Sequence, residues 1–545
     1  MARTLRVCMA QLNLWVGDVE GNVDKMVQAA IEARDTHQAD LVVFPELAVL
    51  GYPPDDLLLR RGLPGKVKDG VTRIRREVSG IGVIVGYPEY TDSGIYNAAD
   101  VYLGDKRVAK YRKQKLPNYG VFDEERHFAQ GDKTCVFEMA GLTIGLTICE
   151  DIWEPGPTAD VAKAGASLLI NINASPFHET KHEQRNQVLA ERARETGLSI
   201  VYVNCVGGQD ELVFDGDSMA ARYDGQIIAR APTFEEGVFL ADVPIDHVAN
   251  AKPAKKTDKS MEQLCWQALT MSIADYVNRN RFDGVLIGLS GGIDSSLVLA
   301  LAVDALGADR VWCVAMPSRY TSELSRREAR AQAERLGVRF SDIGIEPMVE
   351  QFGDALAAEF AGCEVDVTEE NIQSRVRGTL LMALSNKFRY LVLATGNKSE
   401  LATGYATLYG DMAGGFAPLK DVYKTLVFKL ANWRNAQVKS GESPVIPQAV
   451  IDRPPSAELR DDQQDSDSLP PYETLDAIIR AYVEDHATLA ELAEQGFDAE
   501  LVKRVARMIR HNEYKRRQAP PGPKVTARAF GRDRRYPITA VYEDI

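Results

Sequence analysis

The sequence predicts an α/β protein with two layered domains in one chain. Three observations support this fold class. Short apolar runs alternate with helical stretches, a glycine-rich turn follows the apolar run 285–289, and 545 residues are too many for a single core. We therefore expect a layered α/β domain over 1–245, a linker over 246–260, and a doubly wound parallel-sheet domain over 261–545.

Composition narrows the class of protein. Apolar residues make up 45% of the chain and charged residues 26%, which is typical of a soluble globular protein. The net charge of −14 argues against general binding to nucleic acids or anionic membranes. The N-terminus has no signal-peptide core, and the seven scattered cysteines indicate neither a disulfide framework nor a zinc site. We expect a reduced, cytoplasmic enzyme without nucleic-acid or membrane partners.

The first half alternates β-rich runs with polar periodic stretches. Strands are predicted over 6–14, 40–44, 83–87, 143–148, 167–172 and 199–204. Helices are predicted over 23–37, 158–163 and 180–196. This alternation is typical of a layered α/β fold.

Three polar residues lie at or near the ends of these elements. Glu46 follows one apolar run, Cys149 ends another, and Lys113 lies in a lysine-rich run between them. A thiol nucleophile needs a base that takes its proton and a cation that stabilises the thiolate and the developing oxyanion. Glutamate, lysine and cysteine can supply these roles. Because Lys110 and Lys115 lie close to Lys113, the choice of lysine stays open.

The motifs around these residues resemble those of the nitrilase, or carbon–nitrogen hydrolase, superfamily. FPE ends at Glu46, YRK ends at Lys113, and CED begins at Cys149. The resemblance covers about 5–243 and implies an αββα sandwich. It also implies that Glu46 is the general base, Lys113 the partner of the thiolate and oxyanion, and Cys149 the nucleophile.

The same resemblance implies a set of residues that bind glutamine. The motif LPNY ends at Tyr119, the motif NAS ends at Ser175, and Lys181 lies where the family pattern has basic residues. The first half is therefore expected to release ammonia from the side-chain amide of glutamine.

A phosphate-binding loop is predicted in the second half. A helix over 261–278 leads into the apolar run, which SGGIDSS follows at the start of another helix. Glycines let the backbone approach a phosphate, and the free N–H groups of the helix point at it. A P-loop kinase would carry a lysine here, whereas this turn carries Asp294, so Mg²⁺ is implied between the carboxylate and the phosphates. The residues expected to bind ATP are Gly288, Leu289, Ser290, Gly291, Gly292, Ile293, Asp294, Ser295 and Ser296.

This loop resembles that of the pyrophosphatase-loop family, whose members grip the pyrophosphate of ATP and activate a substrate by adenylation. Further strands of one parallel sheet are predicted over 311–315, 339–343 and 390–394. Helices are predicted between them over 322–336, 346–360 and 369–386. Strand–loop–helix repetition around a phosphate site indicates a doubly wound domain.

The motifs ATGNKSE and GYATLYGD resemble the NAD synthetases in particular. By this resemblance Thr395 contacts ATP, while Asn371, Glu400, Asp411 and Lys515 contact deamido-NAD⁺. Because ATGNKSE follows a strand at the ligand-binding edge of the sheet, its glutamate is placed to join the aspartate of the phosphate loop on Mg²⁺.

Over essentially the whole chain, the two halves resemble the glutamine-dependent NAD synthetases. The resemblance implies that glutamine supplies ammonia, which aminates deamido-NAD⁺ through an adenylate and yields NAD⁺, AMP and pyrophosphate. Free ammonia would be protonated and lost in water, so a fused glutaminase predicts an ammonia channel. A homo-oligomer is expected, of a size that the sequence does not decide.

Two other interpretations stay open at the level of sequence. The chain could be another pyrophosphatase-loop amidotransferase, which aminates XMP or modifies tRNA, although the runs 404–411 and 532–538 favour deamido-NAD⁺. Alternatively, the first half could be a scaffold without catalysis, although a scaffold needs no complete Glu-Lys-Cys set. The basic C-terminus lacks an RRM or KH pattern and is better matched to dinucleotide phosphates. The proline-rich segment 453–472 could be a linker or a lid over the substrate.

Overall fold

The structure is a computed structural model, and it describes residues 4–244, 253–254, 259–461 and 463–540. The chain divides into two compact units, Met1–Lys259 and Ser260–Ile545. Most of the linker predicted over 246–260 lies outside the described residues. No helix in the described part of the chain combines the length and the apolar character needed to cross a membrane.

The first unit contains two six-stranded sheets. The first sheet has the order β14 (Gly237–Pro244), β1 (Thr4–Gln11), β2 (Leu41–Val43), β3 (Gly82–Thr91), β4 (Gly94–Leu103) and β5 (Lys106–Arg112). The second has the order β13 (Ile227–Arg230), β12 (Met219–Ala221), β9 (Ser199–Asn204), β8 (Leu168–Asn173), β7 (Leu142–Ile148) and β6 (Val136–Met139). A separate hairpin joins β10 (Val206–Gln209) to β11 (Leu212–Asp215).

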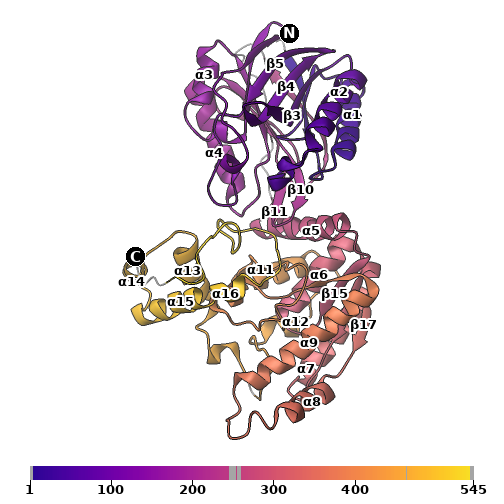
Figure 1. The fold of residues 1–545 in the computed structure, drawn as a ribbon, viewed down its shortest axis with the longest axis vertical. Helices are drawn as coiled ribbons and strands as arrows, with labels where there is room; N and C mark the ends of the chain where they lie inside the picture. Colours follow the sequence, from indigo (N-terminus) through magenta and orange to yellow (C-terminus); the bar gives the residue numbers. More distant parts are fainter. Residues whose placement is uncertain (1–3, 245–252, 255–258, 462, 541–545) are drawn as a thin grey trace. The chain divides into compact units, whose positions relative to one another are not determined.

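These sheets form the inner layers of an αββα sandwich, which confirms the predicted fold class. One apolar core lies between the sheets and contains alternate residues of β1 and β7. Helices α1 (Val19–Asp35) and α2 (Leu63–Glu77) cover the first sheet, and α3 (Pro157–Lys163) and α4 (Lys181–Thr196) cover the second. Figure 1 shows the two helix pairs on opposite sides of the strands.

The second unit contains a four-stranded parallel sheet with the order β17 (Arg339–Asp342), β16 (Val311–Ala315), β15 (Gly284–Gly288) and β18 (Tyr390–Leu393). Helices α6 (Ile293–Leu306) and α7 (Glu323–Leu336) pack on one face, while α8 (Glu346–Leu356) and α9 (Val367–Phe388) pack on the other. The domain is therefore doubly wound, as predicted. Strands β16 and β17 are added on one side of β15 and β18 on the other, so the strand order reverses beside β15, where such folds open a crevice for ligands.

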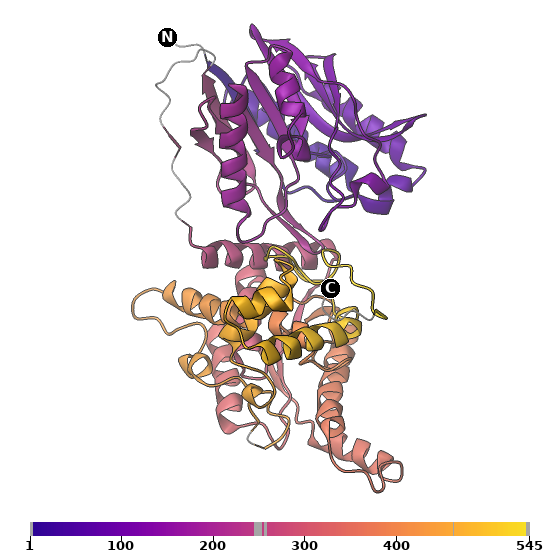
Figure 2. The same ribbon diagram turned by 90° about the vertical axis from the view of Figure 1, so that its left-hand side faces the viewer.

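The remaining helices of the second unit pack outside these layers, and Figure 2 shows the C-terminal ones, in yellow, together in front of the sheet. They are α5 (Met261–Arg279), α10 (Lys398–Thr403), α11 (Lys424–Ala436), α12 (Gln448–Asp452), α13 (Tyr472–Val483), α14 (Leu489–Glu494), α15 (Ala499–His511) and α16 (Glu513–Arg516). The proline-rich segment connects α12 to α13 and contains only one short 3-10 turn among its described residues.

Gly86 on β3 permits a close approach between that strand and the segment that carries Glu46. A Cβ atom at this position would lie 2.6 Å from the carbonyl oxygen of Pro45 and 2.7 Å from the amide nitrogen of Leu47. Backbone atoms cannot move aside as the end of a side chain can. The glycine is therefore required by the position of the glutamate.

Replacing Gly86 by alanine should displace this segment and lower the free energy of unfolding by about 1–3 kcal/mol. Thermal or denaturant unfolding would measure the loss. Gly65→Ala on α2 is the matched control, because a Cβ there has no neighbour within 4 Å. Equal stability of the two variants would contradict the argument.

Candidate functional site

The first unit brings the three predicted catalytic residues together from the ends of three strands, two in the first sheet and one in the second. Glu46 follows β2, Lys113 follows β5 and Cys149 follows β7, and all three side chains are buried. The Nζ atom of Lys113 lies 2.7 Å from Oε1 of Glu46. Lys110 instead pairs with Glu89. The structure thus selects Lys113 as the lysine of the buried cluster.

Cys149 occupies the strained turn at the end of β7, where it is the first residue of the 3-10 helix Cys149–Ile152. Its φ of 45° lies in the left-handed region, which side chains other than glycine rarely adopt. Burial raises the pKa of the thiol well above its ordinary value, and the charge of Glu46 raises it further, while Lys113 lowers it. The thiol is therefore protonated in this environment, and its reaction as a nucleophile requires a base beside it.

Glu124 is a member of this cluster that sequence reasoning missed. Its Oε1 atom accepts hydrogen bonds from Lys113 Nζ at 2.8 Å and from the Tyr52 hydroxyl at 2.9 Å. Burial raises the pKa of Glu124 to about 7, against the lowering effect of Lys113. In the sequence it lies within an acidic run with no feature that separates it from its neighbours. The ammonium is consequently held between two carboxylates.

Backbone and amide donors fix the orientation of Glu46. The Asn97 side chain donates to Oε1 at 2.7 Å, and the Ala174 amide donates to Oε2 at 2.9 Å. Both oxygens therefore have buried donors, which hold the carboxylate beside Lys113.

Asp151 connects the cysteine turn to the segment that follows Lys113. Its Oδ2 atom accepts from the amide of Ile148 at 3.0 Å, and its Oδ1 atom accepts from the amide of Lys115 at 2.8 Å. The Tyr111 hydroxyl also donates to Oδ2 at 2.8 Å. Asp151 thus orients the turn that presents the thiol.

Two of the three predicted glutamine-binding residues lie around this same turn. Tyr119 is 59% exposed, and its hydroxyl donates to Oε1 of Glu150 at 2.9 Å. The Nζ atom of Lys181 lies 3.7 Å from the centre of the Trp153 ring. Ser175 is instead buried, and its hydroxyl accepts from Arg185 Nε at 3.3 Å, which places it in the supporting network.

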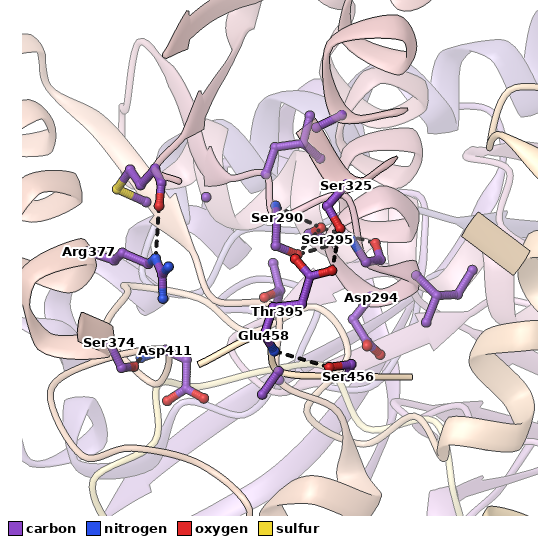
Figure 3. Close-up of a pocket in the computed structure, with 18 of the residues that line it drawn as sticks. Ser290, Asp294, Ser295, Ser325, Ser374, Arg377, Thr395, Asp411, Ser456 and Glu458 are labelled. Atoms are coloured by element: carbon purple, nitrogen blue, oxygen red, sulfur yellow. Dashed lines mark hydrogen bonds between the residues drawn. The ribbon is translucent and has the colours of Figure 1, made fainter. Parts of the chain in front are cut away.

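The second unit contains a cavity of about 270 Å³ at the C-terminal end of its sheet. Figure 3 shows the phosphate loop on one side of this cavity and Arg377 on another. The predicted ATP-binding residues that line it are Gly288, Leu289, Ser290, Gly292, Ile293, Asp294, Ser295 and Thr395. Gly291 and Ser296 are outside its lining; the first faces α7 and the second is buried in α6.

Gly291 forms the corner of the phosphate loop. Its φ is +79°, and an added Cβ would collide with the carbonyl oxygen of Ser325. This residue therefore allows the loop to pack on the start of α7, while the neighbouring residues face the cavity.

Asp294 and Glu400, the predicted Mg²⁺ ligands, converge on the ammonium of Lys424. The Nζ atom lies 2.5 Å from Oδ2 of Asp294 and 3.1 Å from Oε1 of Glu400. Burial raises the pKa of Glu400 to about 8, although Lys424 opposes the shift. Sequence reasoning missed this lysine, which ends the motif PLKDVYK.

The donor set around Lys424 fits a hard cation. Among the described residues, no group of three or more histidine, cysteine or carboxylate side chains is arranged to hold a metal. Mg²⁺, however, is commonly bound by one or two carboxylates with substrate phosphates and water. Two convergent carboxylates next to a phosphate loop match that requirement, and their need for positive charge is met here by the lysine.

The predicted deamido-NAD⁺ residues separate into two groups. Glu400 and Asp411 line the cavity. Asn371 accepts a hydrogen bond from Thr407 at 2.7 Å, and Lys515 donates to the carbonyl of Gly404 at 2.9 Å. The second group therefore supports the GYATLYGD segment from outside the cavity lining.

Arg377 is a cationic residue of the cavity that the sequence analysis missed. Its Nε donates to the carbonyl of Met316 at 3.0 Å, and its two terminal nitrogens have no acceptor in the part of the chain that the structure describes. Burial lowers its pKa to about 10. A half-buried guanidinium with free donors favours binding of an anion.

Comparisons with known proteins agree with this two-site geometry. The family model for carbon-nitrogen hydrolases matches residues 6–253, and the model for NAD synthases matches residues 265–519. A glutamine-dependent NAD(+) synthetase of Xanthomonas campestris pv. campestris (strain 8004) is 50% identical over 99% of this chain and 98% of its own length. The chain belongs to the glutamine-dependent NAD(+) synthetase family.

Other members of the family are similar over their full length. The relative from Acinetobacter baylyi is 47% identical over 98% of both chains. A solved glutamine-dependent NAD⁺ synthetase of Acinetobacter baumannii, in complex with ADP, is 45% identical with a TM-score of 0.79 over 98% of both chains. A family member of known structure from Cytophaga hutchinsonii, 22% identical with a TM-score of 0.85 over 99% of this chain and 98% of its own, shares the fold.

The partly buried ammonium of Lys181 should make the binding of glutamine depend on pH. Burial and, to a smaller extent, the charge of Arg185 lower the pKa of Lys181 to about 8. The side chain is therefore a cation below this pH and neutral above it. Since a cation would bind the α-carboxylate of glutamine, we expect the KM for glutamine to rise as pH increases through about 8.

The matched variant is Lys181→Arg, whose guanidinium stays charged throughout this range. Its KM for glutamine should remain flat, as measured by glutamate release. A natural protein and variant with the same pH dependence of KM would refute a cationic role for Lys181. Reporting KM rather than kcat separates this effect from ionisation of the thiol.

Proposed function

We propose that this chain synthesises NAD⁺ from deamido-NAD⁺, ATP and glutamine. The glutaminase would occupy 1–245 and the synthetase 261–545, with 246–260 as the linker. The observation that carries this proposal is the presence in one chain of two complete sites: a buried Glu-Lys-Cys cluster and a phosphate loop with two convergent carboxylates. Membership of the family supports the same pairing of activities.

In the glutaminase, Glu46 takes the proton from Cys149, and the thiolate attacks the side-chain amide of glutamine. Lys113 stabilises the oxyanion that forms on the amide oxygen. Glu46 then returns the proton to the leaving nitrogen, which departs as ammonia. Water, deprotonated by the same carboxylate, hydrolyses the thioester and releases glutamate. Tyr119, Ser175 and Lys181 make up the proposed glutamine-binding set, in which Ser175 would act through its contact with Arg185.

In the synthetase, the nicotinate carboxylate of deamido-NAD⁺ attacks the α-phosphorus of ATP, and pyrophosphate leaves. Ammonia then attacks the acyl carbon of the adenylate, which releases AMP. The phosphate loop and Thr395 bind ATP, and Asn371, Glu400, Asp411 and Lys515 make up the deamido-NAD⁺ set. Asp294 and Glu400 would hold Mg²⁺, which, when bound, offsets the negative charge of the phosphates.

Ammonia must pass between these reactions without release to water, where it would be protonated. We therefore propose an enclosed channel between the two active sites. We also propose that the protein is a cytoplasmic homo-oligomer with small-molecule substrates and without a nucleic-acid or membrane partner.

The alternative substrates fit less well. An enzyme that aminates XMP or modifies tRNA would share the phosphate loop. The 50% identity to an NAD(+) synthetase over 99% of this chain, however, favours deamido-NAD⁺ as the substrate. A scaffold without catalysis would have no requirement for an oriented glutamate, a buried lysine and a cysteine in a strained turn.

Cys149→Ala should separate the two activities. We expect the natural protein to make NAD⁺, AMP and pyrophosphate from either glutamine or ammonium, and the variant to make them from ammonium alone. Mass spectrometry of the products would measure this difference. Cys135→Ala, at a buried cysteine of the same unit, is the control and should use both donors.

Two results would count against the proposal. Absence of NAD⁺ with both donors in the natural protein would refute the synthetase assignment. Continued use of glutamine by Cys149→Ala would refute the assignment of the nucleophile.

A further inference from the structure

The start of the proline-rich segment crosses the ATP cavity beside the phosphate loop. Arg453, Pro454, Pro455, Ser456, Ala457, Glu458 and Leu459 all line this cavity. Figure 3 shows the carboxylate of Glu458 beside Ser325, close to the serines of the phosphate loop. The sequence left this segment as a linker or a lid, and no motif assigned any of these residues a contact with ATP.

Arg453 connects this segment directly to the phosphate loop. Its Nη2 donates to the carbonyl oxygen of Gly291 at 2.9 Å, and its Nη1 donates to the Ser325 hydroxyl at 2.6 Å. Its Nη2 atom also lies 4.0 Å from the position of a Cβ on Gly292, the next residue of the loop. The guanidinium therefore lies at the corner of the phosphate loop, next to the loop residues that face the cavity.

Glu458 attaches the same segment to α7, and its main partners are two serine hydroxyls rather than Arg453. Its Oε1 atom accepts from the hydroxyls of Ser325 at 2.7 Å and Ser322 at 2.8 Å. Arg453 Nη1 lies 3.4 Å from the same oxygen, which is a longer contact than either serine makes. The carboxylate thus anchors the segment to α7 and neutralises the positive charge of the guanidinium only in part.

The guanidinium of Arg453 retains unused donors. It has five N–H groups, and its described hydrogen bonds occupy three of them. Nε and one hydrogen of Nη2 have no acceptor among the residues that the structure describes, although the side chain is only 18% exposed. An adjacent pair of N–H groups on a permanently charged, largely buried group matches the geometry of a phosphate.

We propose that Arg453 is a catalytic residue that binds the β- and γ-phosphates of ATP and stabilises the departing pyrophosphate. This inference rests on the proposed synthetase reaction. As the carboxylate oxygen bonds to the α-phosphorus, the bond from that phosphorus to the bridging oxygen breaks, and its electron pair leaves with pyrophosphate. The guanidinium offsets the charge that accumulates there, and no proton transfer is needed.

The contact also explains why the segment crosses the cavity. Arg453 can bind a phosphate with Nε and Nη2 while Nη1 remains on Ser325. Bound ATP and α7 would then hold residues 453–459 over the nucleotide from two sides. The arginine thereby couples occupation of the phosphate site to the position of the segment.

Nucleotide binding to the full chain tests this role without the overall reaction. Isothermal titration calorimetry would measure the dissociation constants of Mg·ATP, Mg·pyrophosphate and AMP. The proteins compared are the natural protein, Arg453→Met and Arg453→Lys. We expect Arg453→Met to weaken the binding of Mg·ATP and Mg·pyrophosphate about 10- to 100-fold and to leave the binding of AMP unchanged. Arg453→Lys, which keeps the charge but not the paired donors, should lose less.

Arg460→Met is the matched control on the same segment. Arg460 is 49% exposed, pairs with Asp467 at 2.8 Å and does not line the cavity, so its loss should leave all three affinities unchanged. Unchanged binding of Mg·ATP and Mg·pyrophosphate by Arg453→Met would overturn the proposal. Equal weakening of AMP would also overturn it, because the effect would then be a general distortion of the cavity.

This experiment tests phosphate binding by Arg453 separately from the proposed synthesis of NAD⁺. Binding is measured without deamido-NAD⁺, so a natural protein that binds Mg·ATP but makes no NAD⁺ would contradict the proposed reaction. The comparison of Arg453→Met with Arg460→Met would still decide whether the arginine binds the phosphates.

Discussion

A buried ammonium held between two carboxylates organises the glutaminase site. Lys113 is enclosed by Glu46 and Glu124, and neither the lysine nor Glu46 has an exposed side chain. A buried charge is stable only when it is paired and hydrogen-bonded, so each member of the group requires the other two. Because Asp151 and Ala174 tie this group to the cysteine turn and its neighbouring strand, the reacting groups are oriented before glutamine arrives.

The same arrangement recurs in the synthetase site with a different consequence. Lys424 lies between Asp294 and Glu400, which are the residues expected to hold Mg²⁺ with ATP. The lysine satisfies the two carboxylates in the structure, and Mg²⁺ would compete with it for their oxygens. Arg377 and Arg453 add positive charge elsewhere in the cavity. The site is therefore arranged for a highly charged phosphate substrate rather than for a neutral ligand.

The sequence predicted those features that depend only on residues close together in the chain. Continuous apolar runs predicted β9 and β16 with their observed bounds, since a buried strand requires such a run. Strands with half-exposed faces, such as β5, lack that pattern and were missed. Glu124 and Arg453 were missed as site residues because their importance depends on residues distant in sequence, which only the folded chain brings together. Motif resemblance overcame this limit for Glu46, whose partners are equally distant.

The central claim is that nitrogen from glutamine, released at Cys149, reaches deamido-NAD⁺ within the same protein. The most direct test supplies glutamine labelled with ¹⁵N in its side-chain amide, together with Mg·ATP, deamido-NAD⁺ and an excess of unlabelled ammonium. Mass spectrometry then determines the isotope in the carboxamide of NAD⁺. The account predicts that ¹⁵N predominates despite the excess ammonium. Incorporation in proportion to the free ammonia pool would contradict transfer inside the protein.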